Sequence, residues 1–219
     1  MHLRLRILAL GCFSILTGIA QTSQATDRHA NLSSGELYQR IKAIVEAENP
    51  HGSRIEFSID NCSVLYTSEY KDPDCSVGKP YTGAGTRFEL DKLMTRPDLV
   101  KRWDKDGRYF ASWSFEPITA GKLRKAQQTM WSIVKEFYKT KAPIEERTTK
   151  LTQRAFSGEF GSTVLKHHNF HTRCDGQPQI WNLIGESVTL SFPKDQVEES
   201  ISLLSAYAKR ECPLSLDLQ

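Results

Sequence analysis

The sequence predicts a single α+β domain in which one antiparallel sheet of about five to seven strands packs against three helices. Segments in which apolar and polar residues alternate are separated by turn sequences, which is typical of antiparallel strands with one buried face. Three other segments carry apolar residues at helical spacing, with charged residues on the opposite face. The length of 219 residues suits one such domain with a core of its own.

Residues 1–25 are predicted to be a secretory signal peptide. Arg4 and Arg6 form a short basic start, residues 7–20 are apolar, and small residues then offer a cleavage site. The apolar run is shorter than the ~20 residues that span a membrane; an uncleaved N-terminal anchor is the alternative. We therefore expect residues 26–219 to form an exported domain, periplasmic or secreted, with no stable membrane span after cleavage.

Charge and cysteine content narrow the classes of function. The chain has 29 basic and 26 acidic residues, and the mature domain is nearly neutral because two arginines leave with the signal. No nucleic acid is expected as a partner, since domains that bind it are typically strongly basic. Of five cysteines, Cys12 lies in the signal. The remaining four predict two disulfides in an exported chain.

The first helix is predicted over residues 33–48. Ser33 and Glu36 have capping-box spacing, in which each side chain satisfies a backbone N–H at the helix start. One face of the helix is apolar and is formed by Leu37, Ile41, Ile44 and Val45. Asn49 and Pro50 end the helix, because a residue before proline disfavours helical backbone.

Residues 54–66 predict a hairpin, since apolar residues alternate on both sides of the Asp60-Asn61 turn. The turn sequence Asp72-Pro73-Asp74 then brings the chain back. This return places Cys75 within reach of Cys62, and we predict that these two cysteines form a disulfide.

Residues 75–86 are rich in glycine and proline and predict a surface loop. They match neither the Walker nor the dinucleotide-binding pattern, and no cofactor is expected. Because loops carry binding residues more often than scaffolds do, Lys79 and Tyr81 are candidate binding residues. Arg173, farther along the chain, is a third.

Two strands are predicted next, over residues 86–92 and 108–115, with a short helical turn over 98–105 between them. The second strand carries an aromatic stripe at period two, formed by Tyr109, Ala111, Trp113 and Phe115. Such a stripe favours a core face, and a ligand-stacking platform is the alternative. A second helix is predicted over residues 119–141. Residues 144–160 fit either an edge strand or the start of a helical turn.

The C-terminal unit is predicted to be a hairpin followed by a helix. Strands over 163–174 and 180–192 are joined by Asp175-Gly176, a strong hairpin turn signal. The helix is predicted over residues 195–211, and Cys212 continues its buried stripe. Four cysteines allow three pairings; we prefer Cys174–Cys212 with Cys62–Cys75.

Three histidines in this unit are the candidate catalytic residues: His167, His168 and His171. On a strand, His167 and His171 share a face but lie roughly 13 Å apart, too far to bind one metal ion directly. His168 points to the opposite face, so no metal site is predicted. Acid–base catalysis would need a partner from elsewhere, such as His51, and a cation, Lys166 or Arg173, to stabilise developing charge.

The favoured function is that of an exported, disulfide-stabilised binding protein of the bacterial cell envelope. It would recognise another exported protein or envelope component, as an inhibitor or immunity factor does, because no complete catalytic constellation is found. The alternative is a small secreted hydrolase that acts on phosphoesters or cell-wall polymers through the histidine cluster. A concave site with a carboxylate or a second base near the histidines would favour the enzyme.

Overall fold

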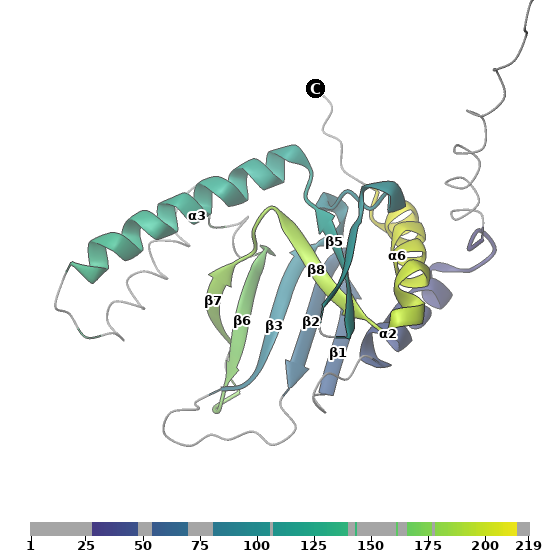
Figure 1. Ribbon diagram of the computed structural model, residues 1–219, viewed down its shortest axis with the longest axis horizontal. Helices are drawn as coiled ribbons and strands as arrows, with labels where there is room; N and C mark the ends of the chain where they lie inside the picture. The colour runs from purple at the N-terminus through teal and green to yellow at the C-terminus, as the bar shows by residue number, and fades with distance from the viewer. Residues whose placement is uncertain are drawn as a thin grey trace, which may run out of the picture.

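The computed structural model describes residues 28–47, 54–69, 81–105, 107–139, 143, 161, 166–176 and 178–213. They form an α+β fold with three α-helices and two antiparallel sheets (Figure 1). The larger sheet has the strand order β1-β2-β3-β6-β7, and the smaller has β4-β5-β8. The strands are β1 (Arg54–Asp60), β2 (Ser63–Glu69), β3 (Tyr81–Glu89), β4 (Lys101–Lys105), β5 (Arg108–Ser114), β6 (His168–Arg173), β7 (Pro178–Leu183) and β8 (Ser187–Phe192).

The α+β class and the three helices are confirmed, but the prediction of one sheet is wrong. The segment predicted as a single strand over 180–192 divides between the sheets: β7 pairs with β6, and β8 pairs with β5. Between β7 and β8, Ile184 donates its N–H to the carbonyl of His167, and the carbonyl of Glu186 accepts the N–H of Phe115. The chain therefore passes from the larger sheet to the smaller one at Gly185, although the apolar pattern of the sequence continues through this position.

Two of the three described helices begin where side chains satisfy their first N–H groups. Helix α2 (Ser34–Ala47) has the predicted capping box, because Ser33 N–H donates to the Glu36 carboxylate and Glu36 N–H to Ser33 Oγ. Helix α3 (Pro117–Tyr138) begins two residues earlier than predicted, since the Glu116 carboxylate accepts two backbone N–H groups at 2.8 Å. Helix α6 (Val197–Glu211) follows the short 3₁₀ turn η4 (Lys194–Gln196).

One core joins the two sheets to α2 and α6. Its largest fully buried side chains include Phe57 of β1, Phe88 of β3 and Trp113 of β5. The predicted core stripe of β5 is confirmed for Ala111, Trp113 and Phe115, which are at most 1 % exposed, while Tyr109 is partly exposed. In Figure 1, α2 and α6 lie together beside the sheets, and α3 extends away from them on the other side.

A disulfide joins Cys62 to Cys212, so both predicted pairings are wrong. Cys62 lies in the two-residue turn between β1 and β2, where Asn61 and Cys62 both have positive φ. Cys212 is the C-cap of α6 and is buried. Packing of α6 beside the sheet brings these distant residues together, across 150 positions of sequence. Cys174 is also disulfide-bonded, and its partner lies outside the described residues.

Two further segments differ from the prediction. The glycine-rich stretch is not wholly a loop, because Tyr81–Glu89 forms β3 in the centre of the larger sheet. Gly85 suits this place because the ring of Phe170 on β6 covers it. The predicted helical turn over 98–105 is instead the 3₁₀ turn η3 (Pro97–Leu99) followed by β4.

The predicted signal over 1–25, the start of the glycine-rich segment and the undecided stretch over 144–160 lie outside the described residues. Within the described part of the chain, no helix is long and apolar enough to cross a membrane.

Candidate functional site

The three candidate histidines lie at the start of β6 or on it. The strand interpretation is confirmed, because His168 pairs with Arg87 of β3 and His171 with Ala84. His168 and His171 therefore project from opposite faces of the sheet. His167 precedes the strand. No group of three potential metal-ligating side chains occurs in the described part of the chain.

His167 is packed between the two sheets. Its imidazole is 1 % exposed and lies edge-on to the ring of Phe115, with 4.8 Å between ring centroids. Its Nδ1 accepts a hydrogen bond from the backbone N–H of Glu89 at 3.4 Å. Burial is the main cause that lowers the pKa of His167 to about 4, and the charge of Lys166 is the second cause. The imidazole is therefore neutral at physiological pH.

A carboxylate and an amine accompany this histidine. Glu89 lies 3.9 Å from His167 Nε2 and forms an ion pair with Lys166 at 2.6 Å. The hydrogen bond from Lys166 to Glu89 raises the pKa of the lysine. These groups are of the types that acid–base catalysis uses. The imidazole is covered, however, so it could exchange a proton with a substrate only if the packing against Phe115 opened.

Two of the three predicted binding residues, Tyr81 and Arg173, lie in the described part of the chain. Lys79 lies outside the described residues. Tyr81 begins β3 and pairs in register with Arg173 at the end of β6, so sheet pairing does bring these two positions together. The Arg173 side chain is exposed and lies 3.7 Å from the Asp175 carboxylate.

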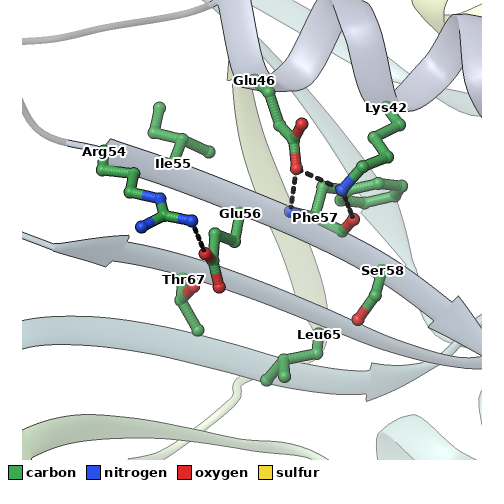
Figure 2. Close-up of a pocket in the computed structure, with 9 residues that line it drawn as sticks. All are labelled: Lys42, Glu46, Arg54, Ile55, Glu56, Phe57, Ser58, Leu65 and Thr67. Atoms are coloured by element: carbon green, nitrogen blue, oxygen red, sulfur yellow. Dashed lines mark hydrogen bonds and ion pairs between the residues drawn. The ribbon is translucent and has the colours of Figure 1, made fainter.

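The larger of the two described pockets has a volume of 380 Å³ and lies between α2 and the β1 edge of the larger sheet (Figure 2). Figure 2 shows Lys42 and Glu46 reaching from α2 to the backbone of Phe57. Glu46 accepts the Phe57 N–H at 2.9 Å, and Lys42 donates to the Phe57 carbonyl at 3.0 Å. Lys42 and Glu46 also pair with each other, as do Arg54 and Glu56. The charged groups of this pocket thus bind one another, and they cover an edge strand.

A smaller, open depression of 210 Å³ lies on the larger sheet where β2, β3 and β6 adjoin. Its lining includes Tyr66, Thr86 and Asn169, and the Thr86 hydroxyl donates to the Asn169 side-chain oxygen at 2.8 Å. Small side chains such as Ser68 and Ala84 leave the depression shallow. It presents few groups that could bind or activate a substrate.

An exposed aromatic cluster lies on the smaller sheet. Trp103 on β4 stacks on Phe110 of β5 with 5.5 Å between centroids and 14° between planes. The guanidinium of Arg108 lies 5.4 Å from the Phe110 centroid and donates to Ser191 Oγ. We call Trp103, Phe110 and Arg108 the aromatic stack. The indole of Trp103 is 42 % exposed, so the stack ends in an aromatic surface open to solvent.

The sequence interpretation missed the aromatic stack. The alternation in β5 assigned Trp113 and Phe115 to the core face, and by the same alternation Phe110 belongs on the opposite face. That assignment was a signal for an exposed aromatic residue. The sequence does not predict the position of Trp103, because residues 98–105 are predicted as a helical turn. Without a strand there, Trp103 has no predicted cross-strand neighbour.

Comparisons with known proteins identify no relative: no family model, no curated protein and no solved structure matches the chain.

Proposed function

We propose that this chain is an exported binding protein of the bacterial cell envelope that recognises another exported macromolecule through the aromatic stack. The single observation that carries the proposal is the exposed Trp103 ring, held in place by Phe110 and Arg108. Tryptophan, tyrosine and arginine are the residues that most often dominate protein interfaces, because they bury a large area at low conformational cost. An inhibitor or immunity factor would use such a surface.

Its surroundings support this role. The five residues of β4 are all exposed, and the Arg102 guanidinium on the opposite side of the strand is anchored to Glu198 of α6. Trp103 therefore projects away from α6. The Cys62–Cys212 disulfide suits an exported protein, and so does the signal-like N-terminus of the sequence.

The alternative function is a small secreted hydrolase, and one observation favours it: the Glu89 carboxylate and the Lys166 amine lie beside His167. Against it stand the burial of the imidazole and its contact with Phe115. A variant in which His167, His168 and His171 are all replaced by alanine tests this alternative. If it keeps its fold but loses a hydrolytic activity of the mature protein, the enzyme is favoured.

Quantitative capture from an envelope extract tests the binding proposal. Immobilised mature protein, Trp103→Ala and Trp131→Ala would be compared for the stoichiometric partner that each retains. Trp131, on α3, is the matched control because its indole is 60 % exposed and lies outside the aromatic stack. We expect Trp103→Ala alone to lose the partner. Equal capture by Trp103→Ala and the parent protein, or loss only with Trp131→Ala, would reject the aromatic stack as the binding surface.

A further inference from the structure

The two sheets present their edge strands to solvent in different ways. At the β1 edge, the Glu46 carboxylate and the Lys42 amine bind both backbone groups of Phe57. A strand that approached there would have to displace two charged side chains. At the β4 edge, no described residue plays this part: β4 pairs only with β5 among the described strands, and all five of its residues are exposed. Open edges pair readily with other strands.

The register of the smaller sheet determines which side chains lie along the β4 edge. Lys101, Trp103 and Lys105 of β4 share the outer face, because Trp103 pairs with Phe110 and Lys105 with Arg108. The other outer-face positions of β5 and β8 are hydroxyl residues: Ser112, Ser114, Ser187, Thr189 and Ser191. On these three strands the outer face therefore carries three cations, two aromatic rings and no carboxylate.

We propose that β4 binds an extended, acidic segment of the partner protein, which adds to the smaller sheet as a further strand. This inference rests on the proposed function and specifies the partner's chemistry. Opposite charges on neighbouring strands stabilise pairing, whereas like charges oppose it. Lys101 and Lys105 thus disfavour a basic strand and favour an acidic one, and the same repulsion keeps the edge from associating with copies of itself.

The spacing on β4 defines the recognised pattern. Lys101 and Lys105 are separated by four residues, roughly 13 Å along a strand, and Trp103 lies midway between them on the same face. A complementary strand carries carboxylates at two positions four residues apart, with an apolar side chain midway to contact the Trp103 ring. The stack of Phe110 and Arg108 behind Trp103 holds that ring in place.

Fluorescence polarisation with synthetic peptides tests this inference. The probe is a fluorescein-labelled peptide in which two glutamates flank a leucine at the stated spacing, with threonine between them. We expect saturable binding that weakens as salt is added. Lys101→Gln/Lys105→Gln and Trp103→Ala should each weaken it roughly tenfold, as the loss of two cross-strand pairs or one anchor predicts. Lys122→Gln/Lys125→Gln, on α3, is the matched control for charge and should bind like the parent protein.

A second experiment tests whether the peptide backbone forms hydrogen bonds with β4. Two versions of the peptide are N-methylated at every second residue, in opposite phases, so that only one of them blocks the N–H groups that face β4. We expect one version to lose binding and the other to keep it. Equal behaviour of the two versions would overturn the added strand, since charge attraction alone does not distinguish them.

Two further arms separate other outcomes. A peptide with lysine in place of glutamate should not bind, and tighter binding of a labelled oligothymidylate than of the acidic peptide would overturn the inference in favour of nucleic acid. Circular dichroism of each variant checks that the fold is kept.

The peptide and capture experiments together distinguish this inference from the proposed function. If the acidic peptide does not bind while envelope capture still depends on Trp103, this inference alone is rejected. If capture does not depend on Trp103, the proposed function is rejected as well.

Discussion

The carboxylate of Glu46 accepts a hydrogen bond from the backbone N–H of Phe57 at 2.9 Å. A helix side chain thereby occupies a place that a neighbouring strand would take at the β1 edge. Burial alone would raise the pKa of Glu46, but the hydrogen bonds from Lys42 and from Phe57 outweigh it and lower the pKa. The carboxylate is thus charged at neutral pH, when it accepts both hydrogen bonds.

Replacing Glu46 should uncover this edge. We expect Glu46→Ala to lower the free energy of unfolding by about 1–3 kcal/mol, since the Phe57 N–H loses a charged acceptor, and to increase self-association through the exposed edge. Denaturant titration and sedimentation velocity measure the two effects. Glu56→Ala is the matched control: its ion pair with Arg54 is exposed, with side chains 50 % and 73 % accessible, and should contribute little. Equal behaviour of the two variants would contradict this account.

The buried His167 should make stability depend on pH. Its pKa is about 4 in the folded protein and near 6.5 when unfolded, so between these values the unfolded chain binds more protons. The contribution to stability is therefore complete above pH 6.5 and is lost as pH falls toward 4. A shift of this size corresponds to about 3 kcal/mol. Denaturant titrations from pH 4 to 7 measure it.

The variant His167→Gln isolates this effect, because glutamine keeps an acceptor for the Glu89 N–H without titrating in this range. It should be less stable than the parent protein at pH 7, and the difference between the two should shrink toward pH 4. If the parent and the variant lose stability in parallel, another group is responsible.

Gly85 should be intolerant of even a methyl group. A Cβ at this position would lie 2.2 Å from Cζ of the Phe170 ring, far inside contact distance. We expect Gly85→Ala to destabilise the protein by about 1–3 kcal/mol through this overpacking. The double variant Gly85→Ala/Phe170→Leu should be less destabilised than the two single effects add up to, because the smaller side chain makes room.

Gly35 supplies the control for Gly85. It lies in α2 with nothing within 4 Å of an added Cβ, so Gly35→Ala should stabilise the helix by up to about 1 kcal/mol. Thermal unfolding of both variants gives the comparison, and a stabilising Gly85→Ala would refute the close packing of Phe170.

Disulfide mapping should find Cys62 joined to Cys212 and Cys75 joined to Cys174. The first follows from the structure. The second follows by elimination, and the register supports it, since Arg173 pairs with Tyr81 only six positions after Cys75. Digestion of the unreduced mature protein with peptide mass analysis checks both; a peptide that joins Cys62 to Cys75 would contradict the fold.

Removing the first disulfide should be costly. It joins residues that are 150 positions apart in the sequence. The chain-entropy model gives about 4 kcal/mol for it, because the predicted Cys75–Cys174 disulfide already shortens the loop that it closes. We expect the Cys62→Ser/Cys212→Ser double variant to unfold at much lower denaturant concentration than the parent protein. A loss below about 1 kcal/mol would show that α2 and α6 hold the turn in place without the bond.

Local chemistry was sufficient to predict several elements from the sequence. Ser33 and Glu36 specify the start of α2 because their hydrogen bonds span only one helical turn. Alternation in β5 specifies its buried face, because side-chain direction follows from the pleat alone. The strand at His168 also follows, and with it the separation of His168 and His171 onto opposite faces.

Tertiary structure decided what local patterns leave open. An apolar run does not encode which sheet it joins, so the division into β7 and β8 depends on pairing with distant strands. A cysteine does not encode its partner, and Cys62 meets Cys212 only because α6 packs beside the turn that holds Cys62. Burial of His167 and stacking of Trp103 on Phe110 likewise depend on neighbours far along the chain. The sequence by itself determined the class of fold and the faces of its strands, since those follow from short-range geometry; the candidate site required long-range contacts.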